Sequence, residues 1–375
     1  MTKKQAASRN GHKLGIKEIG LALLLILVAW LAQECWGINV LDWIEPGPVV
    51  ETELAGDIQV YFTAPTFPET AENRYGGMDE RLAQAIDGAQ QSVDIAAFDF
   101  GLTRVADAVI RADRRGVRVR IVTDSDYEDN ENLVRARNAG IPVVTDDRSA
   151  FMHNKFIVID EQQVWTGSWN LTYNCTYRNN NNVVIIDSKL MAENYTVEFE
   201  EMFIDRQFGI TSPDNTPHPK IELDGVLIET HFEAEGDVRT RMMELIEEAE
   251  HSVYFMAFAF TDDDIAKAMI AAHRAGLDVR GVMAGRNVRG IGSVFEPMQQ
   301  AGVGILPDGN PYTMHHKVMI LDGEIVITGS YNFTASAANR NDENVLIIHS
   351  AEIARLYLAE FGRVYGQAEE KQRSQ

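Results

Sequence analysis

The sequence predicts an α/β protein built from two pseudo-symmetric α-β-α repeats that pack together, preceded by one N-terminal hydrophobic helix. Two observations support this fold class. A long polar-and-apolar pattern occurs twice, as MHNKFIVIDEQQVWTGSWNLT from Met152 and as MHHKVMILDGEIVITGSYNFT from Met314. Within each copy, apolar residues at helical spacing alternate with short strand-like runs, which is typical of layered α/β structure. We expect two such units to pack together as pseudo-symmetric halves.

The N-terminal segment, residues 1–44, combines a basic flank with the apolar run IGLALLLILVAWLA from Ile19 to Ala32. This order is typical of a signal peptide or a signal anchor. We favour an uncleaved anchor because no small-x-small cleavage motif follows the run. Since the positive flank precedes the run, we expect the catalytic body to be extracytoplasmic, either membrane-anchored or, if the segment is cleaved, secreted.

The charge balance limits the partners of the body. The chain has 375 residues and a formal net charge of -22, although its N-terminal segment is basic. An acidic surface repels polyanions and argues against non-specific nucleic-acid binding. The two cysteines, Cys35 and Cys175, provide no disulfide framework, so packing must hold the fold.

The two repeats can be followed element by element. A first helix is predicted because apolar residues recur at helical spacing in both copies. These residues are Leu82, Ala85, Ile86 and Ala89 in the first copy and Met242, Leu245, Ile246 and Ala249 in the second. The strand SVDIAAFDF from Ser92 follows, and SVYFMAFAF from Ser252 matches it.

An alanine-rich helix, a strand and a further helix come next in each copy. The helices end at glycine, which suits a left-handed helix C-terminus. These glycines are Gly116 and Gly140 in the first copy and Gly276 and Gly302 in the second. Only the first copy carries the loop FPETAENRYGG from Phe67, which we expect to flank the cleft entrance. We interpret Arg286 and Arg289 as surface residues of a loop, not as a phosphate clamp.

The domain boundaries follow from these correspondences. We expect the first repeat over residues 57–208 and the second over residues 223–366. Between them, residues 209–222 contain TSPDNTPHPK, whose Pro, Asn and Ser content is typical of a linker.

The duplicated pattern predicts a hairpin with polar residues on one face. Alternate residues of a strand share a face, so His153 and Lys155 project together, away from Met152 and Asn154. The second copy repeats this with His315 and Lys317, and the return strands carry Ser168, Asn170, Ser330 and Asn332. Asp160 and Asp322 fall at the turns, on the opposite face, and we interpret them as structural.

These side chains suit the cleavage of a phosphodiester. A lysine and an asparagine can stabilise the oxygens that gain negative charge in the transition state. One neutral imidazole can attack phosphorus to form a phosphohistidine, while the other, protonated, gives its proton to the leaving alcohol and later activates water. The scheme requires no cofactor, and the nearby carboxylates are too sparse for a metal site.

The paired motifs resemble those of the phospholipase D superfamily, whose signature is His-x-Lys-x4-Asp followed by Gly-Ser-x-Asn. The resemblance covers roughly residues 57–366, and the Thr-Gly-Ser-aromatic-Asn-x-Thr form is closest to a compact branch with a small bacterial nuclease and the mitochondrial cardiolipin hydrolase. Those members have one repeat and pair as dimers, so we expect this chain to be a monomer with an internal pseudo-dimer. The resemblance implies that His153 and His315 are the nucleophile and the acid/base, and that the phosphate lies between the halves. Lys155, Lys317, Asn170 and Asn332 would hold it.

Members of this kind usually carry a downstream carboxylate that orients the histidine. Glu343 fits this position, whereas the matching residue of the first half is Asn181. The halves are therefore not equivalent. A carboxylate would stabilise either role of a histidine, so it does not assign the nucleophile; family precedent favours His153.

Three functions remain open from the sequence. The anchor and the acidic body favour a phosphodiesterase of phospholipids, hydrolysing them or transferring the phosphatidyl group, with a membrane as partner. The alternative is an endonuclease that cleaves DNA or RNA with the same residues, which a strip of Lys or Arg along the cleft would favour. A catalytically silent scaffold is disfavoured because both halves retain the His, Lys and Asn set.

Overall fold

The computed structural model describes residues 49–52, 56–233 and 238–374. Contacts divide the chain into a unit over Met1–Pro46 and a unit over Gly47–Gln375, and both repeats lie in the second unit. The predicted N-terminal hydrophobic helix falls outside the described residues. Within those residues, every helix is too short or too polar to cross a lipid bilayer.

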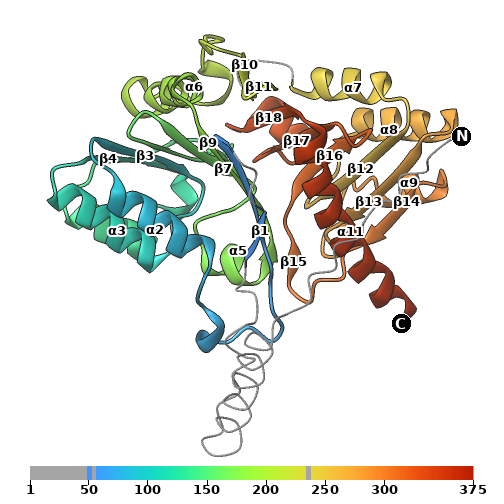
Figure 1. The fold of residues 1–375 in the computed structure, drawn as a ribbon, viewed down its shortest axis with the longest axis horizontal. Helices are drawn as coiled ribbons and strands as arrows, with labels where there is room; N and C mark the ends of the chain where they lie inside the picture. Colours follow the sequence, from blue (N-terminus) through green and yellow to red (C-terminus); the bar gives the residue numbers. More distant parts are fainter. Residues whose placement is uncertain (1–48, 53–55, 234–237, 375) are drawn as a thin grey trace, which may run out of the picture. The chain divides into compact units, whose positions relative to one another are not determined.

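Each repeat is built on an eight-stranded mixed sheet (Figure 1). The first sheet has the order β1-β2-β9-β7-β6-β3-β4-β5, and the second repeats this arrangement as β10-β11-β18-β17-β16-β12-β13-β14. In both, the three strands at one edge are parallel and the others antiparallel. The predicted α/β fold of two similar repeats is confirmed.

The first sheet contains β1 (Val49–Thr52), β2 (Ile58–Thr63), β3 (Ser92–Ala97), β4 (Arg118–Thr123), β5 (Val143–Thr145), β6 (Lys155–Ile159), β7 (Gln163–Gly167) and β9 (Asn182–Asp187). The second contains β10 (Lys220–Leu223), β11 (Val226–Phe232), β12 (Ser252–Ala257), β13 (Asp278–Met283), β14 (Gly304–Pro307), β16 (Lys317–Leu321), β17 (Ile325–Gly329) and β18 (Asn344–His349). β10 begins inside the segment expected as a linker, because Ile221 is buried in the shared core.

Helices flank both sheets, and the predicted apolar faces are the buried ones. Leu82 and Ile86 are buried in α2, as are Leu245 and Ile246 in α7. The helices are α2 (Met78–Gly88), α3 (Thr103–Arg114), α4 (Glu131–Asn138), α5 (Tyr173–Tyr177), α6 (Lys189–Glu200), α7 (Val238–Glu248), α8 (Asp263–Ala275), α9 (Phe295–Gln300), α10 (Ala335–Asn339) and α11 (Ala351–Arg373). Short helical turns are η2 (Ala71–Asn73), η3 (Ser125–Tyr127), η4 (Glu201–Asp205) and η5 (Gly209–Thr211).

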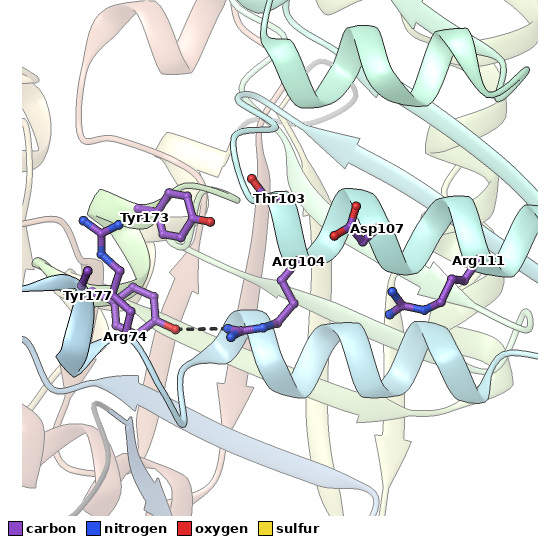
Figure 2. Close-up of a pocket in the computed structure, with 8 residues that line it drawn as sticks. Arg74, Thr103, Arg104, Asp107, Arg111, Tyr173 and Tyr177 are labelled. Atoms are coloured by element: carbon purple, nitrogen blue, oxygen red, sulfur yellow. Dashed lines mark hydrogen bonds between the residues drawn. The ribbon is translucent and has the colours of Figure 1, made fainter.

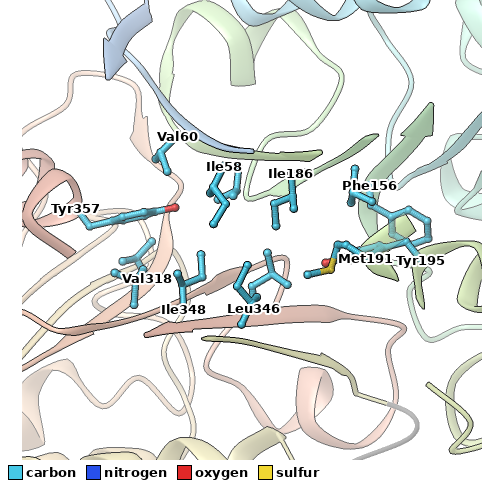
Figure 3. Packing of buried hydrophobic residues seen from close by; sticks show 14 of the residues in the cluster. Ile58, Val60, Phe156, Ile186, Met191, Tyr195, Val318, Leu346, Ile348 and Tyr357 are labelled. Atoms are coloured by element: carbon cyan, nitrogen blue, oxygen red, sulfur yellow. The ribbon is translucent and has the colours of Figure 1, made fainter. Parts of the chain in front are cut away.

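The two repeats share one hydrophobic core. Figure 3 shows apolar side chains of the first repeat facing those of the second across this contact. The labelled residues are Ile58, Val60, Phe156, Ile186, Met191 and Tyr195 on one side and Val318, Leu346, Ile348 and Tyr357 on the other. All are buried. Because burial of apolar surface is the main force in folding, this contact fixes the halves as an internal pseudo-dimer.

A buried polar network crosses the same contact, directly beside the two motif histidines. Asn154 and His316, which follow His153 and His315 in sequence, point into the contact, as the strand alternation predicts. Each bonds to an asparagine of the opposite repeat. The bonds are Asn344 Nδ2 to Asn154 Oδ1 at 2.9 Å and His316 Nδ1 to Asn182 Oδ1 at 3.2 Å. Since buried polar groups require partners, these bonds favour one relative position of the halves.

Backbone pairing joins the repeats at the histidines themselves. The segment β8 (Asn179–Asn180) pairs in parallel with β15 (Thr313–Met314), and Met152 forms the equivalent bridge with Asp342. As a result, His315 N donates to Asn180 O at 2.9 Å and His153 N donates to Asp342 O at 3.0 Å. Each histidine is therefore held by the other repeat.

The glycine of the Thr-Gly-Ser motif is required by a close backbone approach, which gives a stability prediction. Gly167 has a φ of 142°, and a Cβ there would overlap the carbonyl oxygen of Asn182. We expect Gly167→Ala to lower the free energy of unfolding by about 2 kcal/mol or more. Denaturant unfolding would measure this, with Gly88→Ala, where a Cβ meets open space, as the control. Equal stability of the two variants would contradict it.

Candidate functional site

The two motifs meet at one end of the sheets. His153 and His315 lie just before β6 and β16, and Lys155 and Lys317 are the first residues of those strands. β6 pairs with β7, and β16 with β17, so the predicted hairpins are correct. Both histidines line a single cavity with a volume of about 430 Å³.

The two motif aspartates lie at the turns, outside this cavity. Asp160 and Asp322 have φ angles of 54° and 53°. The Asp160 carboxylate accepts hydrogen bonds from the backbone N–H groups of residues 90–92, and the Asp322 carboxylate accepts them from residues 250–252. The two carboxylates therefore tie each hairpin to the strand beside it.

The histidines are oriented crosswise by the opposite repeats. His153 Nδ1 lies 2.7 Å from Glu343 Oε2, and His315 Nδ1 lies 2.9 Å from Asn181 Oδ1. Because carboxylate and amide oxygens only accept, each ring donates its Nδ1–H. This tautomer leaves Nε2 of each ring as the unprotonated nitrogen. One histidine has an anionic partner and the other a neutral one, so the halves are chemically unequal.

The motif serines hold these orienting residues. Ser330 Oγ donates to Glu343 Oε2 at 2.6 Å, and Ser168 Oγ donates to Asn181 Oδ1 at 3.0 Å. The alternation of strand residues predicted that each serine shares a face with the asparagine two positions later, Asn170 or Asn332. In the structure both serines are fully buried and do not line the cavity. The reason is that the chain leaves the strand at the motif glycine, so the alternation ends there.

The lysines are buried against the histidine backbones. Lys155 Nζ donates to His153 O at 2.7 Å, and Lys317 Nζ donates to His315 O at 3.0 Å. Burial lowers the pKa of Lys155 to about 8 and shifts the pKa of Lys317 in the same direction. Burial and the two ammonium groups also lower the pKa of both motif histidines well below its usual value.

Glu343 is the only buried carboxylate bonded to a motif histidine in the described part of the chain. Burial raises its pKa to about 7, against the opposing effect of Lys155 and its hydrogen bonds. Glu343 thus changes protonation near neutral pH. Small changes of charge in the cavity would therefore shift Glu343 between its neutral and its anionic form.

Asparagines and aromatic rings form the walls of the cavity. Asn170 and Asn332 line it, and the Oδ1 atom of each has no hydrogen-bond partner among the described residues. Phe98 contacts the His153 imidazole in a T-shaped arrangement, with ring centroids 4.8 Å apart, and Phe258 is tilted against the His315 imidazole, with ring centroids 4.5 Å apart. They also cover the lysines: Lys155 Nζ lies 5.1 Å from the Phe98 centroid and Lys317 Nζ lies 4.9 Å from that of Phe258.

Sequence reasoning identified the motif residues but missed these two phenylalanines. They occupy matching positions in the repeated strands SVDIAAFDF and SVYFMAFAF, so the repeat itself carried the signal. Their role depends on the ends of β3 and β12 reaching the motif hairpins, which the pairing of β3 with β6 and of β12 with β16 provides.

A family model described as "Cardiolipin synthase, PLD-like domain" matches residues 82–203 and 242–365, which together make up more than half of the chain. The chain belongs to the phospholipase-D-like family. Both repeats are therefore phospholipase-D-like domains, as their motifs predict.

Individual relatives agree with this assignment. A phospholipase D of Rickettsia prowazekii is 32% identical over 163 residues, covering 44% of this chain and 80% of that protein. The mitochondrial cardiolipin hydrolase of Xenopus tropicalis is 38% identical over 125 residues, covering 33% of this chain and 60% of that protein. These names are those of phosphodiester hydrolases, which supports the predicted enzyme class.

The duplicated architecture also occurs in solved structures. Phosphatidylserine synthase of Haemophilus influenzae superimposes with a TM-score of 0.61 over 87% of this chain and 89% of that chain, at 12% identity. At this identity the likeness concerns the fold alone. It extends over both phospholipase-D-like repeats.

The loop unique to the first repeat lines a second cavity, not the one that the two motif histidines line. Residues 71 and 74 border this cavity, which has a volume of about 420 Å³ (Figure 2). Its arginines are paired with carboxylates: Arg104 with Asp79 and Glu80, Arg111 with Asp87, and Arg74 with Glu69. The expectation that this loop flanks the catalytic entrance therefore finds no support in the cavity lining.

Among the described residues, no group of three or more His, Cys, Asp or Glu side chains is placed to hold a metal ion. The candidate catalytic groups that the structure does bring together are the imidazoles, ammonium groups, amides and Glu343.

The pKa values of this site predict a bell-shaped pH dependence for phosphodiester cleavage. Below about pH 7 Glu343 is protonated and no longer polarises His153, and above about pH 8 Lys155 loses its charge. We expect kcat/KM to rise through about pH 7 and to fall above about pH 8. Glu343→Gln should remove the acidic limb and lower kcat about 100-fold or more.

Lys155→Arg is the matched test of the basic limb, because a guanidinium stays protonated. The loss of activity above about pH 8 should be smaller in this variant than in the wild-type protein, because Lys317 is then the one motif lysine that can still lose its charge. A profile that is flat from about pH 6 to about pH 9 in the wild-type protein would contradict both assignments.

Proposed function

We propose that this protein is a metal-independent phosphodiesterase that hydrolyses phospholipids by a phospholipase D reaction through a phosphohistidine. His153 would be the nucleophile and His315 the acid and base. Lys155, Lys317, Asn170 and Asn332 would bind the phosphoryl oxygens. Transfer of the phosphatidyl group to another alcohol would use the same intermediate.

In the first step, His153 Nε2 attacks phosphorus while the bond from phosphorus to the head-group oxygen breaks. His315, protonated at Nε2, gives its proton to that oxygen, and the head-group alcohol leaves. In the second step, water gives a proton to His315 and its oxygen attacks phosphorus. The phosphorus–nitrogen bond breaks, which releases phosphatidic acid and restores His153.

The difference between the orienting residues supports this division of roles. A phosphorylated imidazole is cationic and must persist through a chemical step, which the Glu343 anion beside His153 favours. His315 must release its proton readily, and the neutral Asn181 stabilises its imidazolium less. The two ammonium groups lower the pKa of His315, and the anionic phosphate of a bound substrate would counteract this effect. His315 could then take up the proton that it gives to the leaving group.

The cavity walls are the observation that carries the choice of a lipid over a nucleic acid. Four aromatic residues line the cavity beside asparagine, threonine and serine side chains, and among the described residues Arg286 is the one arginine in its lining. Asp99 adds a carboxyl group. Successive phosphates of a nucleic acid would require a row of cations along the cleft, whereas a glyceride requires apolar walls. The aromatic residues are Phe98, Tyr127, Phe151 and Phe258.

Two further points are consistent with a phospholipid substrate. Relatives of this chain are named cardiolipin hydrolase and phospholipase D. The basic and apolar segment at residues 1–44 would hold the catalytic body at a membrane, on its extracytoplasmic side.

The test is an assay of the full chain with EDTA present throughout. Phosphatidylcholine vesicles, cardiolipin vesicles and single-stranded DNA are offered in parallel. We expect head-group release from lipid and intact DNA, with His153→Asn and His315→Asn each lowering kcat about 1,000-fold or more. His218→Asn, a half-exposed histidine bonded to Glu193, is the control and should retain full activity.

Cleavage of DNA without release of lipid head groups would contradict the substrate while leaving the catalytic residues in place. Loss of activity on EDTA addition, or full activity of either motif variant, would contradict the mechanism.

A further inference from the structure

The loop over residues 285–293, GRNVRGIGS, borders the catalytic cavity and is here called the arginine loop. It leads from β13 toward α9. Its first arginine, Arg286, lines the cavity, with its guanidinium carbon 5.7 Å from the Phe258 centroid. Phe258 in turn packs on His315. The arginine loop is therefore part of the rim of the active site.

The arginine loop is held in a defined shape. Backbone bonds run from Asn287 N to Ala284 O, from Gly290 N to Asn287 O and from Ser293 N to Gly290 O, which makes three successive turns. The Asn287 side chain also donates to Phe258 O at 2.6 Å. Because of these bonds, the tip is fixed relative to the catalytic wall.

The tip combines an apolar side chain with cations. Ile291 is fully exposed, more than any other large apolar residue in the described part of the chain. Arg286 and Arg289 are exposed and form no ion pair with the described residues. This differs from the arginines of the second cavity (Figure 2), which are neutralised by carboxylates. On a chain with a net charge of -22, two unpaired arginines beside an exposed isoleucine form a distinct surface.

The first repeat has the opposite chemistry at the matching place. Its corresponding segment, DSDYEDN from Asp124, exposes Asp126, Glu128 and Asp129. The repeats are offset by 160 residues before this segment, at Gly116 and Gly276, and by 162 after it, at Gly140 and Gly302. The second repeat therefore has two additional residues here, and they extend the arginine loop.

We propose that the arginine loop is a membrane-docking edge that inserts Ile291 among the lipids of an anionic phospholipid surface while Arg286 and Arg289 contact lipid phosphates. This inference rests on the proposed phospholipid substrate. Exposed apolar residues flanked by arginines are favoured at the membrane interface, and each basic residue adds attraction to anionic lipid. Docking at this rim brings the cavity to the level of the phosphodiester.

The test compares one substrate chemistry in two physical forms. The full chain hydrolyses long-chain phosphatidylcholine in vesicles, with and without phosphatidylglycerol, and short-chain phosphatidylcholine below its critical micelle concentration. We expect the double variant Arg289→Glu and Ile291→Asp to lose about tenfold or more of the vesicle rate, chiefly in the anionic vesicles. Its rate on the monomeric substrate should stay within about twofold of the wild-type rate, because neither residue lines the cavity.

The matched control is the double variant Leu190→Asp and Arg274→Glu. It makes the same change of charge and polarity at exposed positions. Leu190 follows the end of β9 that is remote from the cavity, and Arg274 lies at the distal end of α8. This variant should match the wild-type protein on both substrate forms.

Equal vesicle rates for the arginine-loop variant and the wild-type protein would overturn the docking proposal alone. Equal losses on vesicles and on the monomeric substrate would also overturn it, because the loop would then act on the cavity. If the loop variant instead lost only DNA cleavage, the loop would be a nucleic-acid surface. A wild-type protein that cleaves DNA but neither lipid form would refute the proposed function, and the docking edge with it.

Discussion

The hydrogen bond from His153 to Glu343 joins the two repeats at the catalytic cavity, and the rest of the architecture serves to maintain it. The imidazole comes from one repeat and the carboxylate from the other, 2.7 Å apart. A small rotation of one sheet against the other would break this contact. The shared apolar core, the paired backbone segments and the Asn154 and His316 networks all prevent such a rotation. Duplication in one chain thus supplies what a dimer interface would otherwise provide.

The charges of the cavity indicate what it is built to receive. Two ammonium groups, Lys155 and Lys317, are buried with one carboxyl group, Glu343, and burial shifts all three pKa values toward the neutral form. Buried charges are costly unless they are compensated. A phosphodiester anion supplies the compensating negative charge. Binding the substrate would therefore stabilise the protonation states that the reaction requires.

Much of the site could be predicted from the sequence because the pattern is repeated. The constant offset of the motifs identified His153, Lys155 and their partners, and strand alternation separated Asn154 from them. Alternation failed at Ser168, because Gly167 turns the chain out of the strand. Which histidine Glu343 would orient could not be predicted, because the answer depends on how the repeats cross. The sequence predicted that Arg286 lies on a loop. It could not predict that Arg286 lines the cavity, because this depends on tertiary contacts.

We propose that His153, beside the Glu343 carboxylate, is the nucleophile and that His315, beside the neutral Asn181, is the acid and base. Mapping of the phosphorylated histidine tests this proposal most directly. A phosphohistidine is not expected to survive acid, so the reaction is quenched in base during turnover of a phosphodiester that the protein cleaves. The peptide that carries the phosphoryl label is then identified by mass spectrometry. The label should lie on His153 in the wild-type protein and on His315 in the exchange variant Asn181→Glu with Glu343→Asn. A label on His315 in the wild-type protein, or one that stays on His153 after the exchange, would contradict the claim.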